Sequence, residues 1–172
     1  DIFVFSYEIY EHINFRAKHA SIASIPGMYE RTITVNGVSK AFAMTGWRIG
    51  YVAAPQVIAD ACNKVQGQYT SGAGSISQMA ALEAIKTDPQ QSPDIQMMVN
   101  AFKDRRDLLI EMLKEIPGIV TNKPDGAFYV FPDVSYYYGK SDGDTIIRNS
   151  TDLCLYMLDK AHVALVSGDA FG

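Results

Sequence analysis

Two short apolar runs, separated by a loop broken by glycine, occupy residues 32 to 52. The β-branched run 32–35 indicates one strand, and the run 48–52 indicates another. Between them, Lys40 and Arg48 stand eight residues apart among apolar neighbours. A strand that leads directly into such a loop is typical of the sites that open α/β sheets build at their strand ends. The segment therefore predicts an α/β fold in which Lys40 follows a strand.

The chemistry of this loop depends on its two basic residues. Removing an ammonium from water disfavours its charged form, which favours the free amine that a nucleophile needs. Arg48 stays charged and offers a planar fork that suits a phosphate. A nucleophilic Lys40 beside a phosphate clamp suggests pyridoxal 5′-phosphate as cofactor. Taken alone, Lys40 would be interpreted as a solvated surface lysine and Arg48 as a salt-bridge residue.

The stretch 37–50 resembles the lysine signature of the class I aminotransferases, within the aspartate aminotransferase fold family. The resemblance implies that Lys40 forms the Schiff base with pyridoxal 5′-phosphate and that Arg48 holds the cofactor phosphate. Ser39, directly before the lysine, is implied to belong to the same cofactor site. Tyr10 is similar to the family's tyrosine that hydrogen-bonds the cofactor's phenolic oxygen. Segments 124–129 and 167–172 resemble those that flank the substrate pocket.

The same resemblance implies a fold, an activity and partners. Residues 1–100 are expected to form the second half of a large α/β domain with a mostly parallel sheet, and residues 101–172 most of a small α/β C-terminal domain. The family subunit is more than twice as long, so the resemblance is to its C-terminal half. The implied activity is transfer of an amino group between an amino acid and a 2-oxo acid by a cytoplasmic homodimer.

Tyr7 departs from the family pattern. Three residues before Tyr10 the family has an aspartate, whose carboxylate pairs with the cofactor's ring nitrogen. A phenol is uncharged at neutral pH and does not replace that counter-ion. Loss of a charge-assisted hydrogen bond costs roughly 1.5–3 kcal/mol, or about ten- to a hundredfold in rate. We therefore expect weak transamination, with two alternatives: a non-catalytic cofactor-binding or assembly fragment, and a pyridoxal phosphate-dependent lyase of the same fold.

Composition excludes little but points away from some partners. The formal net charge of −4 gives no electrostatic reason to expect nucleic acid or an anionic membrane. Cys62 and Cys154 are isolated and are predicted to be reduced core thiols of a cytoplasmic protein. His12, His19 and His162 are too scattered for a helical metal pair, so we expect no metal site.

Hydrophobic periodicity predicts the remaining elements. The continuous apolar run 2–5 is expected to be a strand buried on both faces. Ser92 and Pro93 are suited to begin a long helix, because one caps its first turn and the other fits its first position. Helices are predicted over 55–69, 75–86, 93–117 and 145–161, further strands over 119–121, 127–131 and 163–166, and a loop over 136–144.

Overall fold

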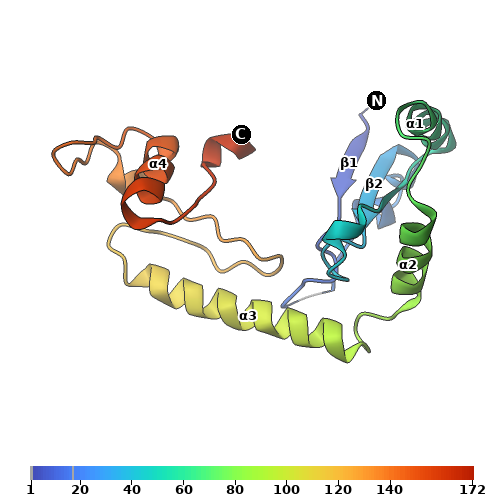
Figure 1. Ribbon diagram of the computed structural model, residues 1–172, viewed down its shortest axis with the longest axis horizontal. Helices are drawn as coiled ribbons and strands as arrows, with labels where there is room; N and C mark the ends of the chain where they lie inside the picture. The colour runs from blue at the N-terminus through green and yellow to red at the C-terminus, as the bar shows by residue number, and fades with distance from the viewer. Residues whose placement is uncertain (1, 17) are drawn as a thin grey trace. The chain divides into compact units, whose positions relative to one another are not determined.

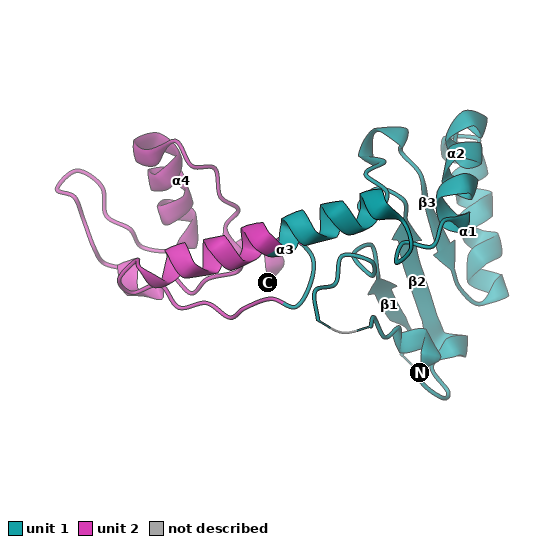
Figure 2. Cartoon of the chain, turned by 90° about the horizontal axis from the view of Figure 1, so that it is seen from below, with its two compact units in different colours: residues 1–103, 125–127 teal, residues 104–124, 128–172 magenta. Residues whose placement is uncertain are grey.

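The computed structural model describes residues 2–16 and 18–172 (Figure 1). Its chain forms two compact units (Figure 2). The first comprises residues 1–103 with 125–127, and the second comprises residues 104–124 with 128–172. The division falls inside a long helix, and a short return segment rejoins the first unit. The assignment of residues 1–100 and 101–172 to two family domains stays a prediction.

The first unit is built on a small sheet. Within the described residues its strands are β1 (Val4–Tyr7), β2 (Thr32–Gly37) and β3 (Gly50–Ala53), in that order. β1 is parallel to β2, and β3 is antiparallel to β2. The carboxyl ends of β1 and β2 and the first residue of β3 therefore meet at one edge of the sheet. The β-branched run predicted for the second strand is confirmed.

Four α-helices and five short 3-10 helices complete the described part of the chain. α1 (Gln56–Tyr69) and α2 (Ser75–Lys86) lie in the first unit, α3 (Pro93–Lys114) begins there, and α4 (Ser150–Ala161) lies in the second. The 3-10 helices are η1 (Ile22–Ser24), η2 (Tyr29–Arg31), η3 (Thr45–Trp47), η4 (Ser135–Tyr137) and η5 (Gly168–Phe171). The predicted cap of α3 is present, since Ser92 Oγ accepts a hydrogen bond from Ile95 N at 3.5 Å.

α4 begins five residues later than its periodicity predicts. Asn149 stands before it in extended conformation, and its side chain accepts a hydrogen bond from Asp152 N at 2.8 Å. A capping side chain of this kind satisfies one of the amide groups that a helix start leaves open. The apolar residues 146 and 147 therefore belong to the preceding loop.

Burial differs from the prediction for β1 and α1. β1 was expected to be buried on both faces, but Phe5 is 68% exposed and none of the described residues of α1 is buried. β1 lies at an edge of the sheet, and its alternating pattern turns Phe5 and Tyr7 to an uncovered face. The buried apolar residues among those described are Ile9, Ile13, Val38, Ala41, Ala81, Ile95, Val99, Ile110 and Ile147.

The runs 119–121, 127–131 and 163–166 form none of the described strands, and the run 119–121 is limited to an isolated antiparallel bridge between Val120 and Asp133. Instead of pairing with 119–121, the return segment pairs with the start of the chain, where Phe15 N donates to Asp125 O and Ala127 N donates to Ile13 O, both at 2.8 Å. Residues 163–166 leave α4 through His162 in left-handed conformation and join no described strand.

The prediction that both cysteines are core thiols is wrong for Cys62. Both are free thiols, but Cys62 is exposed on α1 and Cys154 is half-buried. No described residue of α1 is buried, so Cys62 is exposed together with the apolar side chains of that helix. In the described ranges, no helix combines the length and apolar character needed to cross a membrane.

Candidate functional site

The loop that carries Lys40 is a closed turn after β2. Ser39 O accepts a hydrogen bond from Met44 N at 3.1 Å, and Lys40 O accepts one from Ala43 N at 3.3 Å. Ala43 has a φ of 52°, which lets the chain reverse within five residues. Ser39 and Lys40 are both half-buried. The turn thus fixes the backbone from which the lysine side chain extends.

Arg48 lies where this loop enters β3. Its backbone is left-handed, with a φ of 52°, and its Nη1 donates to Thr45 O at 2.6 Å. The loop is closed by the pairing of Gly37 with Gly50. A Cβ on Gly37 would meet Ile49 O at 3.0 Å, so the close approach of the two strands requires glycine there. Lys40 and Arg48 are therefore held on one tightly closed hairpin.

Tyr7 and Tyr10 lie at the end of the neighbouring strand. Tyr7 is the last residue of β1, opposite Val35, and is 63% exposed. The chain then turns, with Glu11 N donating to Glu8 O at 3.0 Å and Ile13 N donating to Tyr10 O at 2.9 Å. Tyr10 is half-buried within this turn.

The predicted site residues therefore gather at one edge of the sheet. Tyr7 ends β1 and Tyr10 follows it, Ser39 and Lys40 follow the parallel strand β2, and Arg48 precedes the antiparallel strand β3. Tyr7 and Tyr10 also line one cavity of about 330 Å³. Its other lining residues are Glu8, Glu11, Ile13, Asn14, His19, Asp125, Gly126 and Ala127. The described residues of the lysine loop are not among them. The structure thus brings all five residues to one edge and two of them into one cavity.

Glu8 is a functional candidate that the sequence reasoning missed. It is only 7% exposed, and its carboxylate accepts hydrogen bonds from Ser6 Oγ at 2.9 Å and Ser21 Oγ at 2.7 Å. The ring of His19 lies 2.8 Å from the same carboxylate. Burial alone would raise the pKa of Glu8, but these contacts outweigh burial and hold the pKa below its ordinary value.

Glu8, Glu11 and His19 form a compact cluster, each offering one ligand-type atom within 4.8 Å of the others. A signal for it was present in the sequence, where two glutamates three residues apart follow a strand. Residues outside the cluster hold its two carboxylates: Glu8 accepts a hydrogen bond from Ser21 Oγ, and Glu11 accepts one from Asn36 Nδ2 at 2.7 Å. The cluster is thus held together by the protein's own hydrogen bonds.

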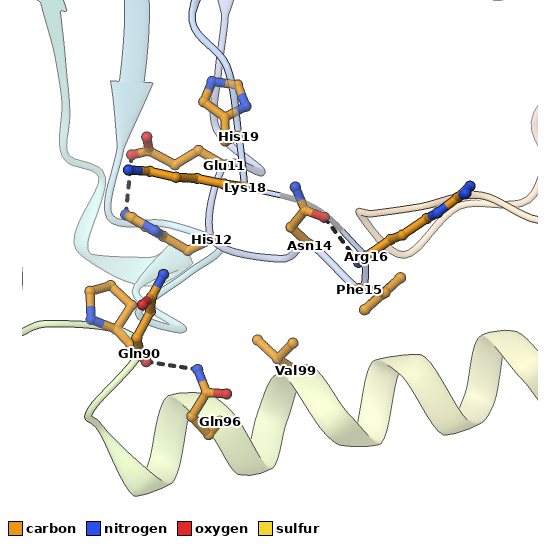
Figure 3. Close-up of a pocket in the computed structure, with 11 residues that line it drawn as sticks. Glu11, His12, Asn14, Phe15, Arg16, Lys18, His19, Gln90, Gln96 and Val99 are labelled. Atoms are coloured by element: carbon orange, nitrogen blue, oxygen red, sulfur yellow. Dashed lines mark hydrogen bonds and ion pairs between the residues drawn. The ribbon is translucent and has the colours of Figure 1, made fainter.

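A second cavity of about 560 Å³ adjoins this cluster (Figure 3). It shares Glu11, Asn14 and His19 with the first cavity, and Arg16 and Lys18 add positive charge to its lining. The far wall comes from the start of α3, where Gln96 Nε2 donates to Pro89 O at 2.9 Å. Arg16 pairs with Asp125 at 3.5 Å, so part of its charge is already balanced.

Comparison with known proteins identifies the family of the chain. The family model described as aminotransferase class I and II matches residues 1–172, the whole chain. The chain belongs to the class I and II aminotransferases. A bifunctional aspartate aminotransferase and glutamate/aspartate-prephenate aminotransferase of Petunia hybrida is 55% identical over 99% of the chain, and an aspartate aminotransferase of Pinus pinaster is 53% identical over 99%.

Solved structures of the family share the fold. The crystal structure of the aspartate aminotransferase from Rhizobium meliloti superposes with a TM-score of 0.89 at 40% identity, covering 99% of this chain and 42% of that one. The chain spans 36% of the Petunia relative and 35% of the Pinus relative. Its α/β architecture is therefore that of part of a fold type I aminotransferase subunit.

Proposed function

We propose that the full-length protein is a pyridoxal 5′-phosphate-dependent aminotransferase of the aspartate aminotransferase type. The observation that carries this proposal is the shared edge of the sheet, where β1 ends in the Tyr10 turn and β2 ends in the Lys40 loop. The antiparallel return of β3 adds Arg48 to the same edge. Membership of the class I and II aminotransferases supports the choice of cofactor.

The residues present fit pyridoxal 5′-phosphate by their donor chemistry. An amine suits the aldehyde, and the Arg48 guanidinium suits the phosphate because it carries five N–H donors, more than its bond to Thr45 uses. The phenol of Tyr10 suits the cofactor's phenolic oxygen. When bound, the cofactor supplies an electron sink for negative charge at the substrate's α-carbon.

Each residue then has a distinct role. Lys40 would hold the cofactor covalently and, with substrate bound, would take the α-proton as a general base and deliver it as a general acid to the cofactor's C4′ carbon. Arg48 and Ser39 would hold the phosphate end, and Tyr10 would donate a hydrogen bond at the phenolic oxygen. Tyr7 would stand where the family has the carboxylate for the ring nitrogen and carries no charge, so we infer a weakened electron sink and slow turnover.

Substrates and assembly follow from the relatives' names and the family. The Petunia and Pinus relatives are named for aspartate, and the former also for glutamate and prephenate. We infer an acidic amino acid as donor and a 2-oxo acid as acceptor. We further infer a cytoplasmic homodimer. Neither nucleic acid nor membrane enters the proposed function.

The test is a single-turnover experiment on the full-length protein loaded with pyridoxal 5′-phosphate. Aspartate should shift the absorption of the bound cofactor and yield one equivalent of 2-oxo acid, and Lys40→Ala should abolish formation of the 2-oxo acid. A lyase would instead release pyruvate continuously from cysteine-like substrates. A cofactor-bound protein that neither transaminates nor releases pyruvate would favour the non-catalytic alternative.

A further inference from the structure

One side-chain hydrogen bond joins the two segments that carry Tyr10 and Lys40. Glu11 Oε1 accepts from Asn36 Nδ2 at 2.7 Å, across 25 residues of sequence. Asn36 is 8% exposed, and its own Oδ1 accepts from Gly37 N at 2.7 Å. Both polar ends of the buried amide are therefore used, one toward Glu11 and one toward the loop of Lys40.

The position of this bond is informative because the backbone pairing of the two segments stops short of it. β1 and β2 pair from Val4 to Tyr7, and the last described backbone bond between them runs from Glu8 N to Val35 O at 2.9 Å. Beyond that point the chain turns away through Tyr10. Glu11 reaches back to β2 from the far side of the turn, so the turn is fastened to β2 at both of its ends.

The surroundings of Glu11 keep its carboxylate close to the sheet. His12 Nε2 lies 3.2 Å from the same Oε1 atom, and the carboxylate is near Glu8 and His19. Tyr51 pairs with Asn36 across β2 and β3, and burial together with the negative charge of Glu11 raises the pKa of Tyr51. Glu11 therefore lies beside the ladder position that precedes the lysine loop.

We propose that Glu11 and Asn36 are positioning residues whose hydrogen bond sets the Tyr10 phenol relative to the Lys40 amine. The proposal rests on the proposed function, because Glu11 and Asn36 are assigned an effect on the cofactor that Tyr10 and Lys40 would hold. Hydrogen bonds that involve a charged group are about twice as strong as neutral ones, and an unpaired buried amide is costly. The pair is thus suited to hold one geometry.

The decisive readout is the pH at which the absorption band of bound pyridoxal 5′-phosphate changes in the full-length protein. A hydrogen-bond donor at the cofactor's phenolic oxygen stabilises the negative charge of that oxygen most when the nitrogen that joins Lys40 to the cofactor has lost its proton. Displacing Tyr10 should therefore raise the transition pH, by about one pH unit if most of one charge-assisted hydrogen bond is lost. Glu11→Ala, Asn36→Ala and Tyr10→Phe should all show this rise.

Combining the Glu11 substitutions with Tyr10→Phe separates an effect on the position of Tyr10 from a general loss of order in the fold. If Glu11 acts through Tyr10, Glu11→Ala should add nothing in the Tyr10→Phe background, and Glu11→Gln, which keeps an acceptor oxygen, should restore most of the parental value. Glu115→Ala, at an exposed glutamate in the second unit, is the matched control and should change nothing. An unchanged transition in Glu11→Ala, or an equal rise in both backgrounds, would overturn the proposal.

A measurement without cofactor keeps the proposal testable if the proposed function fails. Absence of any bound-cofactor band in the parent would refute the function, while amide hydrogen exchange of the apo protein would still decide the structural coupling. In either single variant, exchange should accelerate about tenfold in both segments 9–13 and 37–42. Acceleration in only one of the two segments, or in neither, would contradict the inferred coupling.

Discussion

The carboxylate of Glu8 and the ring of His19 lie 2.8 Å apart, with Glu8 buried directly after the last residue of β1. The same carboxylate accepts from Ser6, in β1, and from Ser21, which caps η1. Three side chains thus converge on one buried acid and fasten the segment before η1 to the strand end. Glu8 holds this side of the turn that carries Tyr10, and Glu11 holds the other.

Acidification should destabilise the protein through Glu8. The folded-state pKa of Glu8 lies below its ordinary value of 4.5, because hydrogen bonds from its three partners outweigh the effect of burial. A carboxyl with a lowered folded pKa stabilises the fold fully above about pH 4.5, and this contribution disappears as pH falls through the folded pKa. The urea concentration at the unfolding midpoint should therefore decrease as the pH is lowered below 4.5. Glu8→Gln should be less stable than the parent at pH 7, and its stability should depend less on acid pH.

The matched control for this pH experiment is Glu30→Gln, at an exposed glutamate in η2. It should leave both the midpoint at pH 7 and the acid dependence unchanged, as surface substitutions do within about 0.5 kcal/mol. At pH 7 Glu8→Gln is expected to cost about 1–3 kcal/mol, since the partners keep a poorer acceptor. An acid dependence in Glu8→Gln as steep as in the parent would contradict the assignment.

Replacement of Tyr7 by aspartate should increase transamination. Tyr7 lines the same cavity as Tyr10, and a carboxylate there would supply the charge that a phenol lacks. The single-turnover rate with aspartate should rise roughly ten- to a hundredfold, the equivalent of one charge-assisted hydrogen bond. Tyr7→Phe, which removes only the hydroxyl, should give no gain. Equal rates in the parent and Tyr7→Asp would show that Tyr7 does not limit the reaction.

Arg106 should be important for the stability of the second unit. It is 8% exposed, its Nη1 donates to Pro124 O at 2.8 Å, and its Nη2 lies 2.8 Å from Asp107 Oδ1. Arg106→Ala leaves the carbonyl unpaired and should lower the free energy of unfolding by about 1.5–3 kcal/mol. Arg105→Ala, at the exposed neighbouring arginine, should cost less than about 0.5 kcal/mol. Equal losses in chemical denaturation would refute the role of this contact.

Two glycine-to-alanine substitutions should have opposite effects. Gly118 has a φ of +83°, and a Cβ there would overlap the ring of Tyr136, so Gly118→Ala should destabilise the protein. Gly67 lies inside α1 with open space around it, so Gly67→Ala should stabilise the protein by about 0.5–1 kcal/mol. Thermal midpoints that move in the same direction would contradict this difference.

Local sequence signals predicted the elements that carry the site. The β-branched run of β2 ends in the loop of Lys40, and Ser92 begins α3 as its cap chemistry requires. These features depend on neighbouring residues, which a single sequence displays. The family resemblance then supplied roles for Lys40, Arg48 and Tyr10 that periodicity alone does not contain.

Long-range contacts were not predictable in the same way. Ala127 pairs with Ile13 rather than with the apolar run that precedes it, and nothing in either segment's sequence names its partner. The Glu8 cluster escaped notice because His19 and Ser21 reach it through folding, not through spacing. Burial of β1 was overestimated because an apolar run indicates what a strand would bury, not whether another layer covers it.

Covalent trapping of the cofactor tests the proposed role of Lys40 most directly. The full-length protein is incubated with pyridoxal 5′-phosphate, reduced with borohydride and digested, and the modified peptide is identified by mass spectrometry. We expect one stoichiometric adduct on Lys40, lost in Lys40→Ala and retained in a Lys64→Ala control on α1. An adduct spread over several lysines, or none on Lys40, would contradict the proposed cofactor site.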